Sequence, residues 1–334
     1  MKIAIIGAGF YGCYMAEKLG DQHIVDVYER HPKILQRAVT NNQHRLHLGY
    51  HYPRAIGTID QVISCYQQFL NEFQDCIKFV DNNIYAIHKN SHVSFDDYKQ
   101  IYDSYAMLNH TEIKKSDEIW NKFKNPQDFQ GGLYTREGTI DLEKLRLRCI
   151  QSIYSNKNIS LYCNKNIDNK NILKLQDKYD YVINCSYNQP YLGFRTQPLE
   201  TKNEHCLLAI MRDSNYVDIG ITIVDGPHCS IYPIKDDMFS LSSVIHTPFN
   251  KNELTDFNLK ASLQNIITHA ENYFAFKDKK VVDYYFGTKT KIKNDTDDQR
   301  ESFIETQDNL ISVFSGKISA VIDCLEKVKT ILSR

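Results

Sequence analysis

The first thirty positions alternate between short apolar runs and breaks that are polar or rich in glycine. Residues 3–6 form a continuous apolar run, which is typical of a buried parallel strand. Small and apolar side chains follow along 13–19, as expected for a helix that packs on a strand, and 24–28 is a second apolar run. The pattern predicts a strand–helix–strand unit at the start of the chain.

Three glycines lie between the first strand and the helix. Gly7, Gly9 and Gly12 form a G-x-G-x-x-G. At this junction the first glycine allows a tight turn, the second lets a pyrophosphate approach the backbone, and the third lets the helix pack on the strand. Glu29 closes the second strand about twenty residues after Gly7, where a carboxylate can accept hydrogen bonds from ribose hydroxyls. The unit predicts a dinucleotide site at a helix amino terminus; a glycine turn of an unrelated α/β protein is the alternative.

Helical and strand-like patterns alternate along the rest of the chain. The predicted helices span 94–108, 142–154 and 253–274, and predicted strands lie within 205–247 and 279–292, before a polar loop at 293–301. The apolar stripe expected on the second of these helices consists of Leu142, Leu145, Leu147 and Ile150.

Size and charge limit the class of protein. At roughly 150 residues per domain, 334 residues favour about two domains. The chain has 40 Lys and Arg against 41 Asp and Glu, so it lacks the basic excess that a nucleic-acid surface needs. No apolar run approaches the ~18 residues of a membrane span. We therefore expect a globular protein with no nucleic-acid partner and no membrane span.

The cysteines and the start of the chain indicate the compartment. Nine cysteines are scattered without a C-x-x-C pair, which favours reduced thiols. Lys2 leads directly into the first strand, so we expect no secretion signal. Both observations predict a cytoplasmic protein.

The segment 40–54 is dense in polar and aromatic side chains, with a glycine and a proline that disfavour a helix. Asn42, His47, Gly49 and the His51–Pro53 stretch resemble the second flavin-contacting motif of the FAD-dependent D-amino-acid oxidase superfamily, in the branch of glycine oxidase and 2-hydroxyglutarate dehydrogenase. His51 stands where that family has an aromatic residue. The resemblance implies an FAD cofactor.

Later segments keep the order of that family. Residues 83–88 and 230–235 resemble substrate-domain strands, and 132–141 resembles its return segment, with Asp141 as N-cap of the next helix. Residues 180–185 resemble the strand that completes the FAD sheet, although it ends in Cys185-Ser186 instead of Ala-Gly.

The resemblance also implies a fold class. We expect an α/β protein in which a Rossmann-like FAD-binding domain is interrupted by a mixed α+β substrate domain with an antiparallel sheet. The expected FAD domain comprises 1–79, 135–195 and 288–334, and the expected substrate domain comprises 80–134 and 196–287.

The end of the chain repeats the strand–glycine–helix pattern. Residues 309–317 lead through Gly316 and Lys317 into a predicted helix at 318–332. The resemblance implies that this junction lies under the flavin pyrimidine, where a helix amino terminus and Lys317 would stabilise negative charge. The residues that we expect to contact FAD are Gly7, Gly9, Phe10, Tyr11, Gly12, Glu29, Arg30, Asn42, Arg45, His47, Gly49, Cys185, Gly316 and Lys317.

The same segments supply candidates for chemistry. His51 is the preferred substrate-side base and His47 the flavin-side group, because imidazole titrates near neutral pH; the alternatives are an ordinary core histidine and a covalent bond to flavin. Tyr52 and Tyr232 are expected to cap the pocket, and Arg54 to bind a substrate carboxylate.

Arg45, Lys289 and the three histidines of this segment carry further expectations. We expect Arg45 to contact a phosphate or the surface, and Lys289 is a further candidate anion partner. A zinc site at His44, His47 and His51 is disfavoured, because their spacing shares a face only on a helix.

Three functions remain open at this point. The first is an FAD-dependent oxidoreductase that oxidises a C–N or C–O bond of a small polar substrate: an amino acid, an amine, a 2-hydroxy acid or a sugar derivative. Its electron acceptor is oxygen or a carrier. The alternatives are a flavin enzyme without net redox change, such as a sugar-nucleotide mutase, and a non-catalytic dinucleotide-binding protein.

Overall fold

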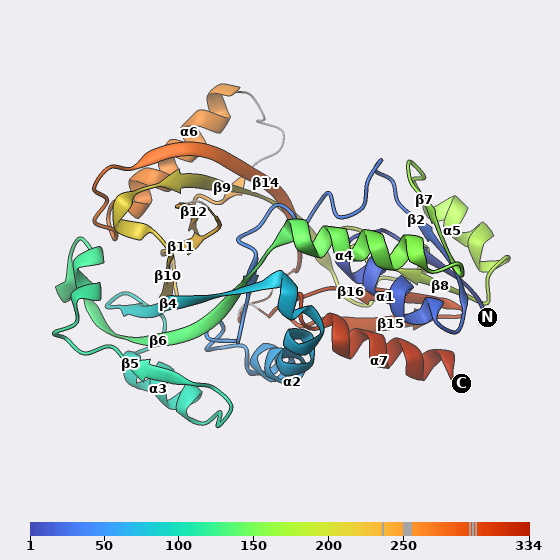
Figure 1. Ribbon diagram of the computed structural model, residues 1–334, viewed down its shortest axis with the longest axis horizontal. Helices are drawn as coiled ribbons and strands as arrows, with labels where there is room; N and C mark the ends of the chain where they lie inside the picture. Colours follow the sequence, from blue (N-terminus) through green and yellow to red (C-terminus); the bar gives the residue numbers. More distant parts are fainter. Residues whose placement is uncertain (236, 250–255, 294, 296, 298) are drawn as a thin grey trace.

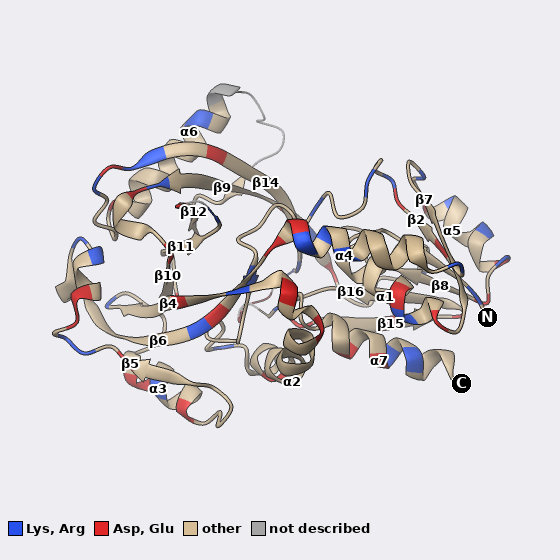
Figure 2. Ribbon diagram, in the orientation of Figure 1, with Lys and Arg blue, Asp and Glu red and all other residues tan. Residues whose placement is uncertain are grey.

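The computed structural model describes residues 1–235, 237–249, 256–293, 295, 297 and 299–334. The chain forms two β-sheets, one in each half of the molecule (Figure 1). One sheet has six strands and the other has ten. Both chain termini lie at the end of the molecule that holds the smaller sheet. Acidic and basic residues are interspersed along the ribbon in both halves of the molecule (Figure 2).

The smaller sheet is almost entirely parallel. Its strand order is β15 (Phe303–Gln307), β16 (Leu310–Phe314), β8 (Tyr181–Asn184), β1 (Lys2–Ile6), β2 (Ile24–Tyr28) and β7 (Ile159–Tyr162), with only β15 antiparallel to its neighbour. Successive residues of β1 face opposite sides, as the pleat requires. Ile3 and Ile5 pack towards α1 (Phe10–Gly20), α4 (Leu142–Ser155) and α7 (Val321–Leu332), whereas Ala4 and Ile6 pack towards α5 (Asn169–Gln176). This is a Rossmann-like layer arrangement.

The larger sheet is mixed and mostly antiparallel. Its path is β13 (Pro248–Phe249), β9 (Thr201–Arg212), β12 (Met238–Ser243), β11 (Cys229–Pro233), β10 (Ile219–Val224), β4 (Ile77–His88), β6 (Phe129–Ile140) and β3 (Arg45–Leu46). Two further strands extend it: β14 (Lys280–Ile292) pairs with β9, and β5 (His110–Glu112) pairs with β6. Only β10 and β4 run parallel. The expected fold class is therefore confirmed.

Two helices pack on the larger sheet, and each contributes to a different apolar cluster. α6 (Asp256–Ala270) contributes Ile266, Ile267 and Ala270 to one cluster. α3 (Phe95–Asp103) contributes Tyr98 and Tyr102 to the other. Short 3-10 helices lie at Gln74–Cys76, Glu118–Lys122, Pro126–Asp128 and Ser214–Tyr216.

Most predicted elements are present with shifted ends. The helix expected at 94–108 ends at Asp103, and the helix expected from 318 begins at Val321. Asp141 caps α4 by accepting from the amides of Glu143 and Lys144, as predicted. The start expected for α6, at 253, falls outside the described residues.

The apolar stripe predicted on α4 is wrong in part. Leu145, Cys149 and Ile153 are its buried residues, at intervals of four, while Leu147 is 54% exposed. The predicted stripe included every leucine of this segment. In the helix, however, Leu147 lies two residues from Leu145 and so points to the opposite, exposed side.

One long helix was not predicted. α2 (Ile56–Phe73) follows the aromatic segment directly and buries Ile59, Val62, Tyr66, Phe69 and Phe73. The spacing of these residues, three and four in alternation, is a clear helical signal. β7 and α5 were also missed, and both are short.

The predicted domain boundaries fall inside long strands. Residues 79, 134 and 287 lie within β4, β6 and β14. Each of these strands belongs to the larger sheet along its whole length. The division into an FAD domain and a substrate domain stays a prediction.

Candidate functional site

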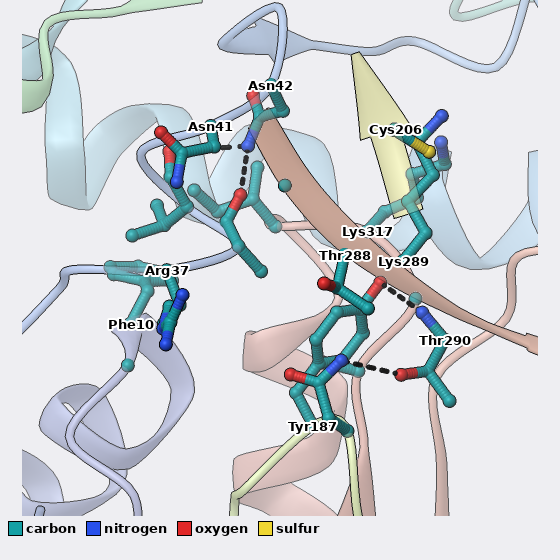
Figure 3. A pocket seen from close by; sticks show the side chains of 18 of the residues that line it. Phe10, Arg37, Asn41, Asn42, Tyr187, Cys206, Thr288, Lys289, Thr290 and Lys317 are labelled. Atoms are coloured by element: carbon teal, nitrogen blue, oxygen red, sulfur yellow. Dashed lines mark hydrogen bonds between the residues drawn. The ribbon is translucent and has the colours of Figure 1, made fainter. Parts of the chain in front are cut away.

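A cavity of about 500 Å³ lies between the two sheets. Its wall begins at the glycine turn, continues along the 36–45 loop and reaches His47, His51 and Tyr52. The opposite side consists of the segment after β8, the end of β14 and the Gly316–Lys317 turn (Figure 3). The cavity therefore joins both ends of the site that was predicted from sequence.

The glycine turn has the geometry that a pyrophosphate site requires. Gly7 has a φ of +96°, and a Cβ there would lie 2.9 Å from the carbonyl oxygen of Cys185. A Cβ on Gly12 would overlap the carbonyl of Gly7, whereas a Cβ on Gly9 would meet no atom within 4 Å. Gly7 and Gly12 are thus required by packing, and Gly9 leaves open space for a ligand.

The amino terminus of α1 is free to bind an anion. Its N-cap residue is Gly9, no side chain caps the helix, and its first turn has no acidic residue. Unpaired amides at a helix start attract negative charge. This end of the cavity fits the phosphates of a dinucleotide.

Glu29 lines the cavity but also holds its own loop. One carboxylate oxygen accepts from the amide of Ala8 at 2.8 Å, and the other accepts from the amide of His31 at 2.8 Å. The carboxylate is thereby fixed beside the turn, with lone pairs left for ribose hydroxyls. Arg30 is exposed, and its Nε donates to His31.

Phe10 and Tyr11 have structural partners besides the cavity that they line. Phe10 packs against Tyr14, Phe69 and Phe73, so its ring belongs mainly to the core between α1 and α2. The hydroxyl of Tyr11 lies 2.9 Å from Ser302 Oγ and donates to the carbonyl of Lys317. Tyr11 therefore connects the phosphate end of the cavity to the Lys317 turn.

The 40–54 segment is a loop with a short strand, as predicted. The side-chain amide of Asn42 donates to the carbonyls of Ala38 and Val39 and accepts from the amide of His44, so it shapes its own loop (Figure 3). Gly49 has a φ of +95°, and a Cβ there would lie 3.1 Å from Ile59. Both residues were expected to contact FAD; in the structure, Asn42 lines the cavity and Gly49 packs against α2.

His47, His51, Tyr52 and Lys317 form a compact group, here called the His–Tyr–Lys cluster. The ring centroids of His47 and His51 are 5.8 Å apart, and each lies within 6 Å of the Tyr52 ring. The Lys317 ammonium donates to the Tyr52 hydroxyl and lies 4.2 Å from the centre of that ring. Nδ1 of both histidines is buried without a hydrogen-bond partner. Orphaned buried nitrogens of this kind indicate a place where a ligand or water completes the site.

Burial and positive charge shift the titration of the cluster. Burial lowers the pKa of His47 and of His51 well below 6.5, and the charges of Lys317 and Arg45 lower both further. Burial, followed by the charge of Arg45, lowers the pKa of Lys317 to about 7. The two imidazoles are therefore neutral near pH 7, and Lys317 titrates in the neutral range instead of near pH 10.5.

Two residues that sequence reasoning missed hold the lysine turn. Ser302 Oγ accepts from the amide of Gly316 at 2.7 Å. Gln61 of α2 donates to the Ser302 carbonyl at 2.8 Å and accepts from its amide at 2.7 Å. A Cβ on Gly316 would overlap the carbonyl of Arg300. Because α7 starts only at Val321, this turn and not a helix terminus presents Lys317 to the cavity, which corrects the expectation.

Lys289 and Cys185 lie on the opposite wall. Lys289 lines the cavity from β14 and makes no ion pair with any residue that the structure describes (Figure 3). Two residues fix the neighbouring Thr290. The Tyr187 hydroxyl accepts from the Thr290 amide, and the Asn188 side-chain amide donates to the Thr290 hydroxyl. Cys185 is buried beneath the glycine turn, where burial raises the pKa of its thiol, so it supports the turn as a neutral group.

Three predicted site residues have other roles. Arg45 lines the cavity but is buried and pairs with Glu137 at 3.0 Å inside the larger sheet, so it is not a surface residue, and its contact with a phosphate stays a prediction. Tyr232 is fully buried, donates to the carbonyl of Gly138 and lies outside the cavity lining, so it does not cap the pocket. Arg54 is exposed, forms a two-point pair with Asp225 and also lies outside the lining. Sequence alone places these residues near the site but cannot show their partners.

Within the described part of the chain, no three or more His, Cys, Asp or Glu side chains are arranged to hold a metal ion. His44 uses its Nε2 on the carbonyl of Thr40. Likewise, none of the described helices combines the length and the apolar character needed to cross a bilayer.

Sequence comparisons place the chain near flavoproteins. No family model matches it. It is 24% identical over 352 residues to the FAD-dependent monooxygenase FPY4 of Fusarium mangiferae, covering 99% of this chain and 91% of that protein. It is 33% identical over 87 residues to the FAD-dependent monooxygenase kojA of Aspergillus flavus, covering 26% of this chain and 20% of that protein.

Structural similarity extends over nearly the whole chain. Glycine oxidase from Geobacillus kaustophilus superposes with a TM-score of 0.70 at 13% identity, covering 97% of this chain and 94% of that one. L-α-glycerophosphate oxidase from Mycoplasma pneumoniae, solved with FAD bound, has a TM-score of 0.69 at 15% identity, covering 100% and 94%. These matches confirm the predicted resemblance at the level of the fold: the chain has the fold of glycine oxidase and of L-α-glycerophosphate oxidase.

Proposed function

We propose that the protein is an FAD-dependent oxidoreductase that oxidises a C–N or C–O bond of a small, polar, anionic substrate. The observation that carries the proposal is the single cavity that runs from the glycine turn to the His–Tyr–Lys cluster. The first end fits the phosphates of FAD, and the second brings a potential proton acceptor and two lysines together. The similarity to proteins named FAD-dependent supports the choice of cofactor.

FAD, when bound, supplies the acceptor for a hydride from the substrate carbon. Gly7, Gly9, Gly12 and Glu29 would hold its phosphates and ribose, for the geometric reasons given above. Lys289 and Lys317 would neutralise the anionic group of the substrate, because both ammonium groups line the same cavity. His51 would accept the N–H or O–H proton that the substrate loses.

The electrostatics of His51 suit this role. Burial, and then the charges of Arg45 and Lys317, lower the pKa of its imidazole, so the ring is neutral and able to accept a proton, but it is a weak base. An anionic substrate would offset those positive charges and raise the pKa of His51. The substrate itself would thus make the base stronger at the moment when it is needed.

The test is anaerobic mixing of the yellow holoprotein with amino acids, amines, 2-hydroxy acids and sugar-derived acids. We expect visible flavin absorbance after purification or reconstitution, and bleaching by members of one of these classes. His51→Gln is expected to slow bleaching about 100-fold or more while FAD stays bound. The exposed His92 provides a matched control, since His92→Gln should leave the rate unchanged.

Other outcomes would decide against the proposal. A colourless protein that binds NAD would overturn it. Turnover of a sugar nucleotide without net oxidation, dependent on reduced flavin, would indicate a mutase instead. Unchanged bleaching in His51→Gln would remove the assigned role of His51 and leave the oxidoreductase assignment in place.

Monooxygenation is a second candidate, favoured by the whole-chain similarity to a protein named as a monooxygenase. In that reaction NADH or NADPH, not the substrate, reduces the flavin, and one atom of O₂ enters the product while the other leaves as water. Anaerobic bleaching by NADPH but not by substrate, with ¹⁸O from O₂ in the product, would support it.

A further inference from the structure

We propose that Glu137 is a positioning residue, which through its buried pair with Arg45 fixes the segment that carries His47 and sets the charge facing the His–Tyr–Lys cluster. The inference rests on the proposed function for its catalytic meaning. Neither residue was expected to act in this way from sequence, and Glu137 lies on β6, outside the cavity lining.

The geometry ties Glu137 to both sides of His47. One carboxylate oxygen accepts from the amide of Leu48 at 2.7 Å, and the other accepts from the Arg45 guanidinium at 3.0 Å. His47 therefore lies between two residues that are fixed by one carboxylate. Loss of either bond would free the backbone that directs its ring into the cavity.

The rest of the network leaves the pair little freedom. Glu137 also accepts from Tyr85 at 2.8 Å and from Asn83 at 3.3 Å. Arg45 donates to Thr222 at 2.7 Å and to Tyr85 at 2.6 Å, and its guanidinium lies 4.3 Å from the centre of the Tyr232 ring. The side chains of Arg45 and Glu137 are 2% and 0% exposed. The larger sheet thus holds the segment from β4, β6, β10 and β11.

Stability alone does not account for the pair. Buried ion pairs usually add no more stability than apolar residues of similar size, because both charges lose their hydration. Retention of a buried pair is better explained where the charge or the orientation has a use. Here Arg45 acts electrostatically on His47, His51 and Lys317, all of which line the cavity.

Glu137 limits that effect by compensating the charge of Arg45. The other charged or titratable groups that face Lys317 and the two histidines are Tyr52, Lys289 and Arg300. Loss of the carboxylate would leave Arg45, Lys289, Arg300 and Lys317 without this compensation. Protonation of Lys317 would then become less favourable, and binding of an external anion more favourable.

The test uses the full-length protein, with and without FAD, and the variant Glu137→Gln, which keeps the shape of the side chain. Lysines are labelled with ¹³C-methyl groups, and the Lys317 signal, assigned with Lys317→Met, is titrated by NMR. We expect the pKa of Lys317 to fall by about half a unit or more. Acetate, a simple carboxylate probe, should bind about threefold or more tightly below that pKa.

Two controls separate charge from mere loosening of the network. Thr222→Val removes a partner of Arg45 without changing charge, so it should lower the melting temperature but leave the Lys317 titration unchanged. Asp128→Asn removes a carboxylate from a surface pair with Lys89, away from the cavity lining, and should change neither. A Lys317 titration that is the same in Glu137→Gln as in the unaltered protein would overturn the inference.

The test of Glu137 can be distinguished from the test of the proposed function. The titration of Lys317 can be read without FAD, so an unaltered pKa refutes the role of Glu137 even when FAD binds normally. Absence of FAD binding with a shifted pKa would refute the proposed function alone. If Glu137→Gln does not fold, the apolar double variant Arg45→Met and Glu137→Leu should raise the pKa of Lys317 less than Arg45→Met alone does, and an equal rise in the two variants would contradict the inference.

Discussion

Lys317 has an environment unlike that of an ordinary exposed lysine. It is half-buried, donates to Tyr52 and lies near Arg45, and its pKa falls from 10.5 to about 7. Tyr11, Ser302 and Gln61 hold the backbone on which it stands. A lysine in such a position can bind an anion when protonated and loses that ability as it titrates.

The titration predicts a pH dependence of stability. Because folding lowers the pKa of Lys317, the unfolded chain holds an extra proton between about pH 7 and 10.5. The free energy of unfolding therefore rises with pH across this window, and the penalty is fully present below about pH 7. We expect Lys317→Met to be more stable than the unaltered protein at pH 6 by about 1–3 kcal/mol, a value reduced by residual hydration and by the lost bond to Tyr52.

Urea unfolding at pH 6 and pH 10 measures this difference, which should shrink at the higher pH. The exposed Lys289 offers the control, since Lys289→Met should show no such gain. The same ionisation should appear in ligand binding: affinity for an anionic substrate should fall above about pH 7, and Lys317→Met should flatten that profile. A profile that keeps its shape in this variant would show that another group titrates.

At the scale of elements, the glycine turn shows how a strand–helix junction becomes a binding site. The backbone of β1 enters the turn through Gly7 at a φ of +96°, and α1 starts without a side-chain cap. Gly12 is required because the helix lies against the Gly7 carbonyl. Gly9 has no such neighbour, and its backbone is extended at φ −71° and ψ −178°, which alanine can adopt.

Alanine substitutions at these two positions should therefore differ. Gly12→Ala should destabilise the protein by about 1–3 kcal/mol, because the added methyl group must displace packed backbone. Gly9→Ala should change stability by less than about 0.5 kcal/mol, yet weaken FAD binding about tenfold or more. Urea unfolding and fluorescence titration with FAD measure the two effects. Equal FAD affinity in Gly9→Ala and the unaltered protein would refute a close approach of phosphate at this residue.

At the scale of the whole molecule, the cavity depends on both sheets. The glycine turn belongs to the smaller sheet, while His47, His51 and Lys289 come from or next to strands of the larger one. The long strands β4, β6 and β14 lie in the larger sheet, and each has one end beside the smaller sheet: the start of β4 and the ends of β6 and β14 (Figure 1). A ligand that fills the cavity should therefore stabilise both parts.

Trp120 allows this coupling to be measured. It is the one tryptophan of the chain and is buried in the core of the larger sheet, far along the chain from the glycine turn. FAD at about 100 times its dissociation constant should add about 2.7 kcal/mol to the free energy of unfolding. We expect the Trp120 fluorescence transition in urea to move accordingly, whereas NAD should leave it in place. A transition that ignores FAD would show that the larger sheet unfolds independently.

Local patterns alone predicted much of this architecture. The strand–glycine–helix unit, the Asp141 cap and the non-helical 40–54 segment each depend on interactions within a few residues, so they can be read from neighbouring positions. α2 was not predicted although its buried residues recur at helical spacing, because it directly follows the aromatic 40–54 segment, whose glycine and proline disfavour a helix.

Tertiary structure decided which of the candidate side chains reach the cavity. Arg45 meets Glu137 across 92 positions, Tyr52 meets Lys317 across 265, and Tyr11 meets Ser302 across 291. No periodicity encodes such pairs, since they arise when sheet pairing and burial bring distant segments together. The sequence by itself thus determined most of the elements and the glycine turn. Only the folded chain could remove Tyr232 and Arg54 from the site, join Lys317 to Tyr52, and place the Arg45–Glu137 pair behind His47.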